Sequence, residues 1–96
     1  MADELQVTHD AAAHRFMVAM RGQEAFLAYR PHGDTLDFSH TFVPELFQGR
    51  GAAEKLCHAA FEYAKANRLT VIPSCSYVSG AYLKRHPEYV SLIRGA

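Results

Sequence analysis

The spacing of apolar residues changes at Pro44, and this change constrains the fold more than any other feature of the sequence. Through residues 35–43, apolar and polar residues alternate, which is typical of a half-buried strand. Proline cannot donate to a strand ladder, so Pro44 ends that strand. Beyond it, apolar residues recur at the spacing of one helix face: Ala53, Leu56, Cys57, Ala60 and Ala64. We therefore predict a strand followed by an amphipathic helix of about four turns.

Two further strands are predicted before this one. Residues 15–21 alternate, with Phe16, Val18 and Met20 on one face, and the reversal at Gly22 leads into a β-prone run over residues 24–30. A second turn cluster at residues 31–34 then leads into the strand that Pro44 ends. The pattern predicts a three-stranded antiparallel meander, with residues 5–9 joining at one edge.

After the helix, the sequence predicts one more strand and one more helix. Asn67 is the expected left-handed C-cap, residues 69–72 form a short apolar strand, and residues 77–85 form a shorter helix. A strand, helix and strand in succession favour a right-handed crossover with parallel neighbours. We expect an α/β (α+β) fold with a mixed, mainly antiparallel sheet of four to five strands and two helices, in a single domain over residues 1–96.

Composition and charge narrow the possible environments and partners. The chain has 96 residues, 49% of them hydrophobic, which is ordinary for a globular domain. Lys and Arg together number ten, as do Asp and Glu, so the formal net charge is zero. No overall electrostatic attraction therefore favours nucleic acid or a membrane as a partner. Cys57 and Cys75 form no CxxC pair, and neither a signal peptide nor an apolar span is evident. These features predict a cytoplasmic protein. We expect a monomer or a weak homodimer, since an exposed sheet edge could pair two copies.

The six histidines raise the question of a metal site. They are spread along the chain without an HxxxH or Cys-x-x-Cys pairing: His9, His14, His32, His40, His58 and His86. We therefore predict no structural metal.

The loop between the predicted strand and helix is the best candidate for chemistry. It contains Gly49 and Gly51 and opens directly into the helix. The first amides of a helix have no intrahelical partner and carry partial positive charge, and glycines let a phosphate approach the backbone. The loop is not a Walker motif, because it lacks the Gly-Lys-Ser or Gly-Lys-Thr of that motif. It is not a full GxGxxG fingerprint either, since no third glycine follows. The alternative interpretation is a tight turn that requires glycine for its backbone alone.

This loop also carries a resemblance to a known family. The segment Gln48-Gly49-Arg50-Gly51-Ala52-Ala53 resembles the Gln/Arg-x-x-Gly-x-Gly/Ala signature of the GCN5-related N-acetyltransferases. Other segments are similar to those of a subfamily of short, stand-alone acetyltransferase-like domains: His40-Thr41, Val43-Pro44, residues 73–78 and residues 86–89. The resemblance covers about residues 7–92.

The resemblance implies a cofactor and a reaction. Acetyl-CoA would be the acyl donor and an amine-bearing molecule the acceptor, so the chain would be an N-acetyltransferase. Phe42 and Val43 would offer backbone groups to the pantetheine arm. The pyrophosphate would be held by the loop and the helix start: Gln48, Gly49, Arg50, Gly51, Ala52 and Ala53. The thioester would lie between the strand that ends at Val43 and the next strand.

The resemblance also implies catalytic residues. Family members place a tyrosine seven residues after an Asn that follows the fifth strand, where it can protonate the departing thiolate. Cys75 stands in the place of that Asn, and counting from it reaches Tyr82. The acetyl group could pass directly to the amine, with His40, Glu45 or water as the base, or could first be carried by Cys75.

Each of these residues also has a structural interpretation. Cys75 and Tyr82 could simply be core residues. His40 falls on the same predicted strand face as Leu36, Phe38 and Phe42, so a buried, hydrogen-bonded histidine is the alternative to a base. At the level of function, the alternatives are a CoA- or acyl-CoA-binding module without turnover and a purely structural interaction domain.

Overall fold

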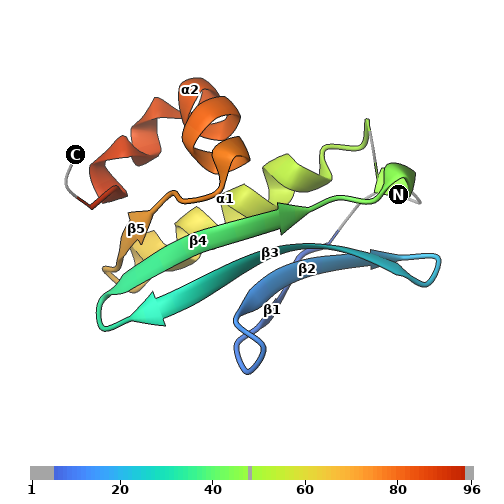
Figure 1. The fold of residues 1–96 in the computed structure, drawn as a ribbon, viewed down its shortest axis with the longest axis horizontal. Helices are drawn as coiled ribbons and strands as arrows, with labels where there is room; N and C mark the ends of the chain where they lie inside the picture. Colours follow the sequence, from blue (N-terminus) through green and yellow to red (C-terminus); the bar gives the residue numbers. More distant parts are fainter. Residues whose placement is uncertain (1–5, 48, 95–96) are drawn as a thin grey trace.

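A computed structural model describes residues 6–47 and 49–94 as a five-stranded mixed sheet with helices packed on it. The strands lie side by side in sequence order, β1 to β4 antiparallel and β5 parallel to β4 (Figure 1). Their bounds are β1 Thr8–Asp10, β2 Arg15–Met20, β3 Gln23–His32, β4 Thr35–Phe42 and β5 Thr70–Ile72. The predicted fold class and the parallel crossover are confirmed.

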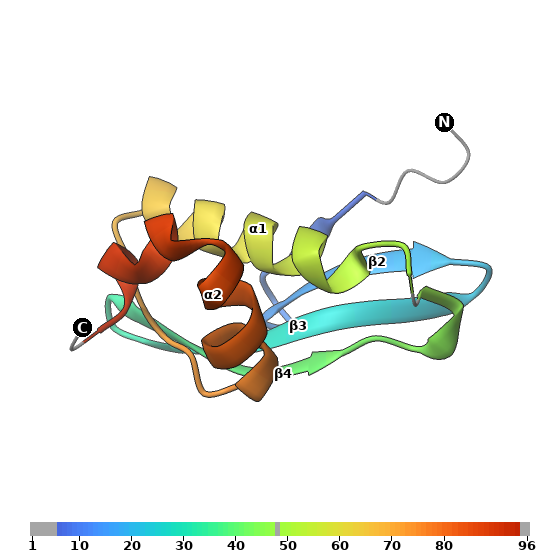
Figure 2. The ribbon, with the colours of Figure 1, turned by 90° about the horizontal axis from the view of Figure 1, so that it is seen from above.

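The helices pack on one face of the sheet. The longest is α1, Ala52–Ala66, and the segment after β5 contains a wide π-helical stretch, η2 Tyr77–Tyr82, continued by α2 Leu83–Arg85. Short 3-10 helices lie before and after: η1 Glu45–Phe47 and η3 Pro87–Leu92. In Figure 2, α1 and the helical segments after β5 lie on the same side of the sheet.

The end of α1 differs from the prediction in one detail. Asn67 is not left-handed, with φ of −100°, and the left-handed residue is Arg68, with φ of 57°. The Asn67 side chain donates to the Tyr63 carbonyl at 2.8 Å, while the Leu69 amide donates to the Ala64 carbonyl at 2.8 Å. This is the pattern of a Schellman motif, in which the residue after the C-cap takes the left-handed conformation.

The core lies between the sheet and α1, and Phe61 of α1 is at its centre. The Phe61 ring contacts Phe38 of β4 at a centroid distance of 5.1 Å, and Tyr82 and Tyr89 of the later helical segments at 5.6 and 4.9 Å. Phe61, Phe38 and Tyr82 are fully buried. One side chain thus packs α1 against both the sheet and the C-terminal helices.

A β-bulge in β4 corrects one expectation about side-chain direction. Tyr29 pairs with Phe38 and Ala28 with His40, so Ser39 is an extra residue without a counterpart on β3. An extra residue shifts the two-residue alternation by one position. Phe38 is therefore buried under α1, whereas His40 is exposed, contrary to the prediction that they share a face.

Within residues 6–47 and 49–94, no helix is both long enough and apolar enough to cross a membrane. In the same part of the chain, no three His, Cys, Asp or Glu side chains are grouped so that they could hold a metal ion.

Candidate functional site

A cavity of about 430 Å³ lies where β4 gives way to α1. Thr41 and Val43 from the end of β4 form one wall, and Tyr77 and Arg85 from the segment after β5 form another. The remaining lining comes from the loop and the helix start: Phe47, Gly49, Gly51, Ala52, Ala53 and Glu54. The cavity therefore joins the glycine loop to the ends of two neighbouring strands.

The loop backbone is shaped to leave space in front of the helix. Gly49 and Gly51 have φ of 76° and 74°, a conformation that side chains other than glycine rarely adopt. A Cβ atom at either position would meet no atom within 4 Å, so the backbone faces open space. Glycine is required here by conformation rather than by crowding.

The start of α1 presents its amides to this space. The first backbone bond of the helix runs from the Lys55 amide to the Gly51 carbonyl at 3.0 Å, so the amides of Ala52, Ala53 and Glu54 precede the intrahelical ladder. Together with the helix dipole, they form a site suited to an anion.

Two residues predicted for this site are placed differently. The Arg50 side chain turns back toward η1, where its Nε donates to the Leu46 carbonyl at 3.2 Å, and Arg50 is not among the residues that line the cavity. Gln48 lies outside the described residues.

The bulge brings Thr41 to the cavity, where it meets Cys75. Thr41 pairs with the buried Leu27, and its Oγ1 lies 3.4 Å from the Cys75 Sγ. The Cys75 amide donates to the Phe38 carbonyl at 2.9 Å, which fixes the loop after β5 against β4 next to the bulge. Cys75 is therefore held beside Thr41, a residue of the cavity wall, by both its backbone and its side chain, although Cys75 itself is not among the residues that line the cavity.

The two cysteines differ in their electrostatic surroundings. Partial burial opposes ionisation of Cys75, but hydrogen bonds with the Thr41 side chain and with the backbone at Val78 and Tyr77 outweigh it and lower the thiol pKa. Cys57, fully buried on α1, has its pKa raised by desolvation. Of the two thiols, that of Cys75 is thus the one that ionises more readily.

The tyrosine reached by counting from Cys75 does not line this cavity. Tyr82 is fully buried, its ring stacks on His86 at 4.4 Å, and its hydroxyl makes no hydrogen bond within the described part of the chain. The tyrosine on the cavity wall is Tyr77 instead. Burial raises the pKa of Tyr77, so its phenol stays protonated at neutral pH.

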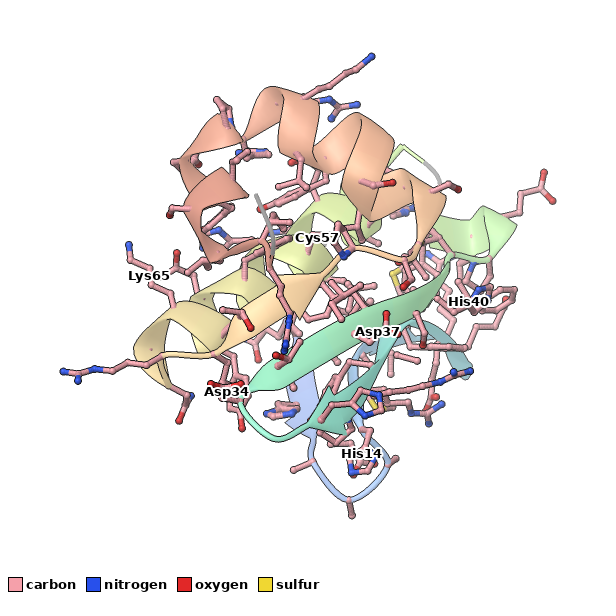
Figure 3. All side chains as sticks on the ribbon, turned by 60° about the vertical axis from the view of Figure 1, so that its left-hand side comes forward. His14, Asp34, Asp37, His40, Cys57 and Lys65 are labelled. Carbon is pink, nitrogen blue, oxygen red and sulfur yellow. The ribbon has the colours of Figure 1, made fainter. Side chains whose placement is uncertain are left out.

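The remaining predicted residues lie apart from the cavity. His40 and Phe42 lie on the uncovered face of the sheet, where both rings pack against Phe26. Figure 3 shows His40 and Cys57 on opposite sides of β4. Of the predicted cofactor residues, five line the cavity: Val43, Gly49, Gly51, Ala52 and Ala53.

Sequence reasoning missed five residues that line the cavity: Thr41, Phe47, Glu54, Tyr77 and Arg85. Thr41 is a polar residue of the alternating pattern in residues 35–43, and the bulge that turns it toward the cavity has no clear signal in the sequence. Tyr77 and Arg85 lie on the helical segment predicted at residues 77–85, but the direction of their side chains depends on how that segment packs against α1.

Comparisons with known proteins define the class to which this chain belongs. The family model of the GCN5-related N-acetyl-transferases matches residues 15–92, and the chain belongs to this family. Protein NATD1 of Xenopus tropicalis is 34% identical over 89 residues, covering 90% of this chain and 81% of that protein. Protein NATD1 of Homo sapiens is 33% identical over 86 residues, with coverages of 86% and 75%.

A solved structure supports the same assignment. The solution NMR structure of a GCN5-like protein from Staphylococcus aureus, described as an N-acetyltransferase candidate, matches with a TM-score of 0.74 and 25% identity. The match covers 100% of this chain and 93% of that one. The resemblance drawn from the sequence is confirmed.

Proposed function

We propose that this chain transfers an acetyl group from acetyl-CoA to an amine. The observation that carries the proposal is the cavity that joins the N-terminal end of α1 to Thr41 beside the β4 bulge, with Cys75 in contact with Thr41. Membership of the GCN5-related family supports acetyl transfer as the type of reaction. Acetyl-CoA would supply the activated acyl group as a thioester.

The residues of the cavity divide between binding and proton transfer. The amides of Ala52, Ala53 and Glu54 would hold the pyrophosphate, and Val43 would face the pantetheine arm. Tyr77 would give a proton to the departing thiolate, because its phenol is protonated and lines the cavity. Neither His40 nor Glu45 lines the cavity, which leaves water among the three predicted bases.

A matched pair of tyrosine variants tests this assignment. With acetyl-CoA and a panel of amines, release of the CoA thiol should fall by about a hundredfold or more in Tyr77→Phe, the usual size of a lost general acid. Tyr82→Phe should keep its turnover and be at least as stable, because the lost hydroxyl is buried without a partner. The reverse result would restore Tyr82 as the acid.

The same assay separates the enzyme from a binding module. Acetyl-CoA binding by the wild-type chain without thiol release with any amine would support a CoA-binding module and contradict turnover. Absence of CoA binding would contradict both the enzyme and the binding module. It would favour the remaining alternative, a structural interaction domain.

Cys75 offers a covalent route alongside direct transfer. Its thiolate would attack the thioester carbonyl, forming a new S–C bond while the CoA sulfur leaves and takes a proton from Tyr77. The amine would then attack the acetyl group and displace the Cys75 thiolate, and its released proton would restore the Tyr77 phenol. The lowered pKa of Cys75 and the adjacent Thr41 hydroxyl favour this role.

Mass spectrometry distinguishes the two routes. If Cys75 carries the acetyl group, incubation with acetyl-CoA should add one acetyl mass that hydroxylamine removes and that is absent in Cys75→Ala. Because the pKa of Cys75 is lowered, labelling should rise with pH and level off at a lower pH than the labelling of an ordinary free thiol. Cys57→Ala is the control and should be labelled normally. Full turnover by Cys75→Ala would exclude the covalent route.

A further inference from the structure

An acidic side chain lies at the place where an anion would have to bind. Glu54 is in the first turn of α1 and lines the same cavity as Gly49, Gly51 and Ala53. A carboxylate there stabilises the helix by interacting with its dipole. The same carboxylate repels a pyrophosphate, so the site needs compensating positive charge.

Two residues at the end of α2 meet this carboxylate. Arg85 Nη1 lies 2.8 Å from Glu54 Oε2, and His86 Nε2 lies 2.9 Å from Glu54 Oε1. The side chains of Arg85 and His86 are anchored differently. His86 stacks on the buried Tyr82 ring, and its Nδ1 lies 3.5 Å from Glu88 Oε2. Arg85 has a side chain 63% exposed, against 31% for Glu54.

Arg85 is therefore the group that can change partner. It already lines the cavity that holds the α1 amides, while its ion pair is largely solvated. Exposed ion pairs are weak, whereas a guanidinium binds phosphate oxygens through two parallel hydrogen bonds. His86 can keep its contact with Glu54 Oε1 when Arg85 turns away from Oε2.

We propose that Arg85 completes the pyrophosphate site, and that Glu54 holds the guanidinium beside the α1 amides and competes with the phosphate for it. This inference rests on the proposed function, because it assigns a further residue to the same cofactor. It makes Arg85 a determinant of specificity for CoA over ligands that lack the pyrophosphate. It also gives Glu54 and Arg85 opposite effects on binding.

Calorimetric titration of the whole chain tests this assignment, with CoA, inorganic pyrophosphate and pantetheine as ligands. Arg85→Gln should weaken CoA and pyrophosphate about ten- to a hundredfold, the usual range for lost charge-assisted hydrogen bonds, and should leave pantetheine unchanged. Glu54→Gln should strengthen CoA binding severalfold, because it removes the competing carboxylate. Lys84→Gln, which removes the same charge from an exposed neighbour outside the cavity lining, is the control and should have little effect.

The sign of the Glu54 effect separates this proposal from a structural ion pair. If the pair only ties α2 to α1, Glu54→Gln and Arg85→Gln should weaken binding and lower the unfolding midpoint together. That result, or equal CoA affinity in Arg85→Gln and wild type, would overturn the role of Arg85 and leave the proposed cofactor intact. Failure of the wild type to bind both CoA and pyrophosphate would overturn the cofactor assignment as well.

Discussion

Replacing Ala53 by Glu is expected to abolish the stabilisation of this protein by acetyl-CoA. A ligand at a hundredfold excess over its dissociation constant adds about 2.7 kcal/mol, or roughly ten to twenty degrees in a domain of this size. Ala53 lines the cavity at the start of α1, so a carboxylate there would repel the pyrophosphate. Thermal unfolding with and without excess acetyl-CoA measures the difference.

The same substitution should not weaken the fold itself. Ala53 is only partly buried, and a negative charge in the first turn of a helix adds about 0.3–1 kcal/mol of stability. Ala53→Gln is the matched control, since it adds nearly the same volume without the charge and should keep most of the ligand shift. An undiminished shift in Ala53→Glu would mean that the phosphates do not bind at this helix end.

The second large effect concerns Phe61, and here the fold rather than the ligand should change. Phe61→Ala is expected to lower the free energy of unfolding by about 3–5 kcal/mol, as truncations of buried aromatic residues usually do. Its ring is fully buried and contacts Phe38, Tyr82 and Tyr89, so its loss leaves a cavity between α1, the sheet and the C-terminal helices. Chemical denaturation with a fitted midpoint measures the change.

Phe42→Ala is the control for this prediction. It makes the same chemical change on the uncovered face of β4, where Phe42 is 46% exposed, and should cost about 1 kcal/mol or less. Equal losses in the two variants would mean that the core is not organised around Phe61. A large loss in Phe61→Ala should also impair acetyl-CoA binding, because the same contacts position the segment that carries Tyr77 and Arg85.

The sequence predicted the order and type of the main elements because those follow from local patterns. Alternation before Pro44 and helical spacing after it are properties of neighbouring residues, and they recover β2, β4 and α1 within a few positions. The glycine loop was also found, since positive φ at Gly49 and Gly51 is a local requirement.

The directions of the side chains at the site were less predictable. The bulge at Ser39 depends on how β4 pairs with β3, and it alone moves Thr41 into the cavity and His40 out to the opposite face. Similarly, a count of seven residues from Cys75 reaches Tyr82, but the packing of the wide helical turn buries that ring beneath α1 and leaves Tyr77 at the cavity.

The sequence alone thus determined the strand and helix pattern, the position of the glycine loop and the family resemblance, because periodicity, glycine conformation and motif spacing are encoded locally. Only the tertiary structure decided which side chains meet at the cavity. Thr41 and Cys75 are 34 positions apart, and Glu54 and Arg85 are 31 apart. Contacts at such separations depend on strand register and helix packing, which no local pattern specifies.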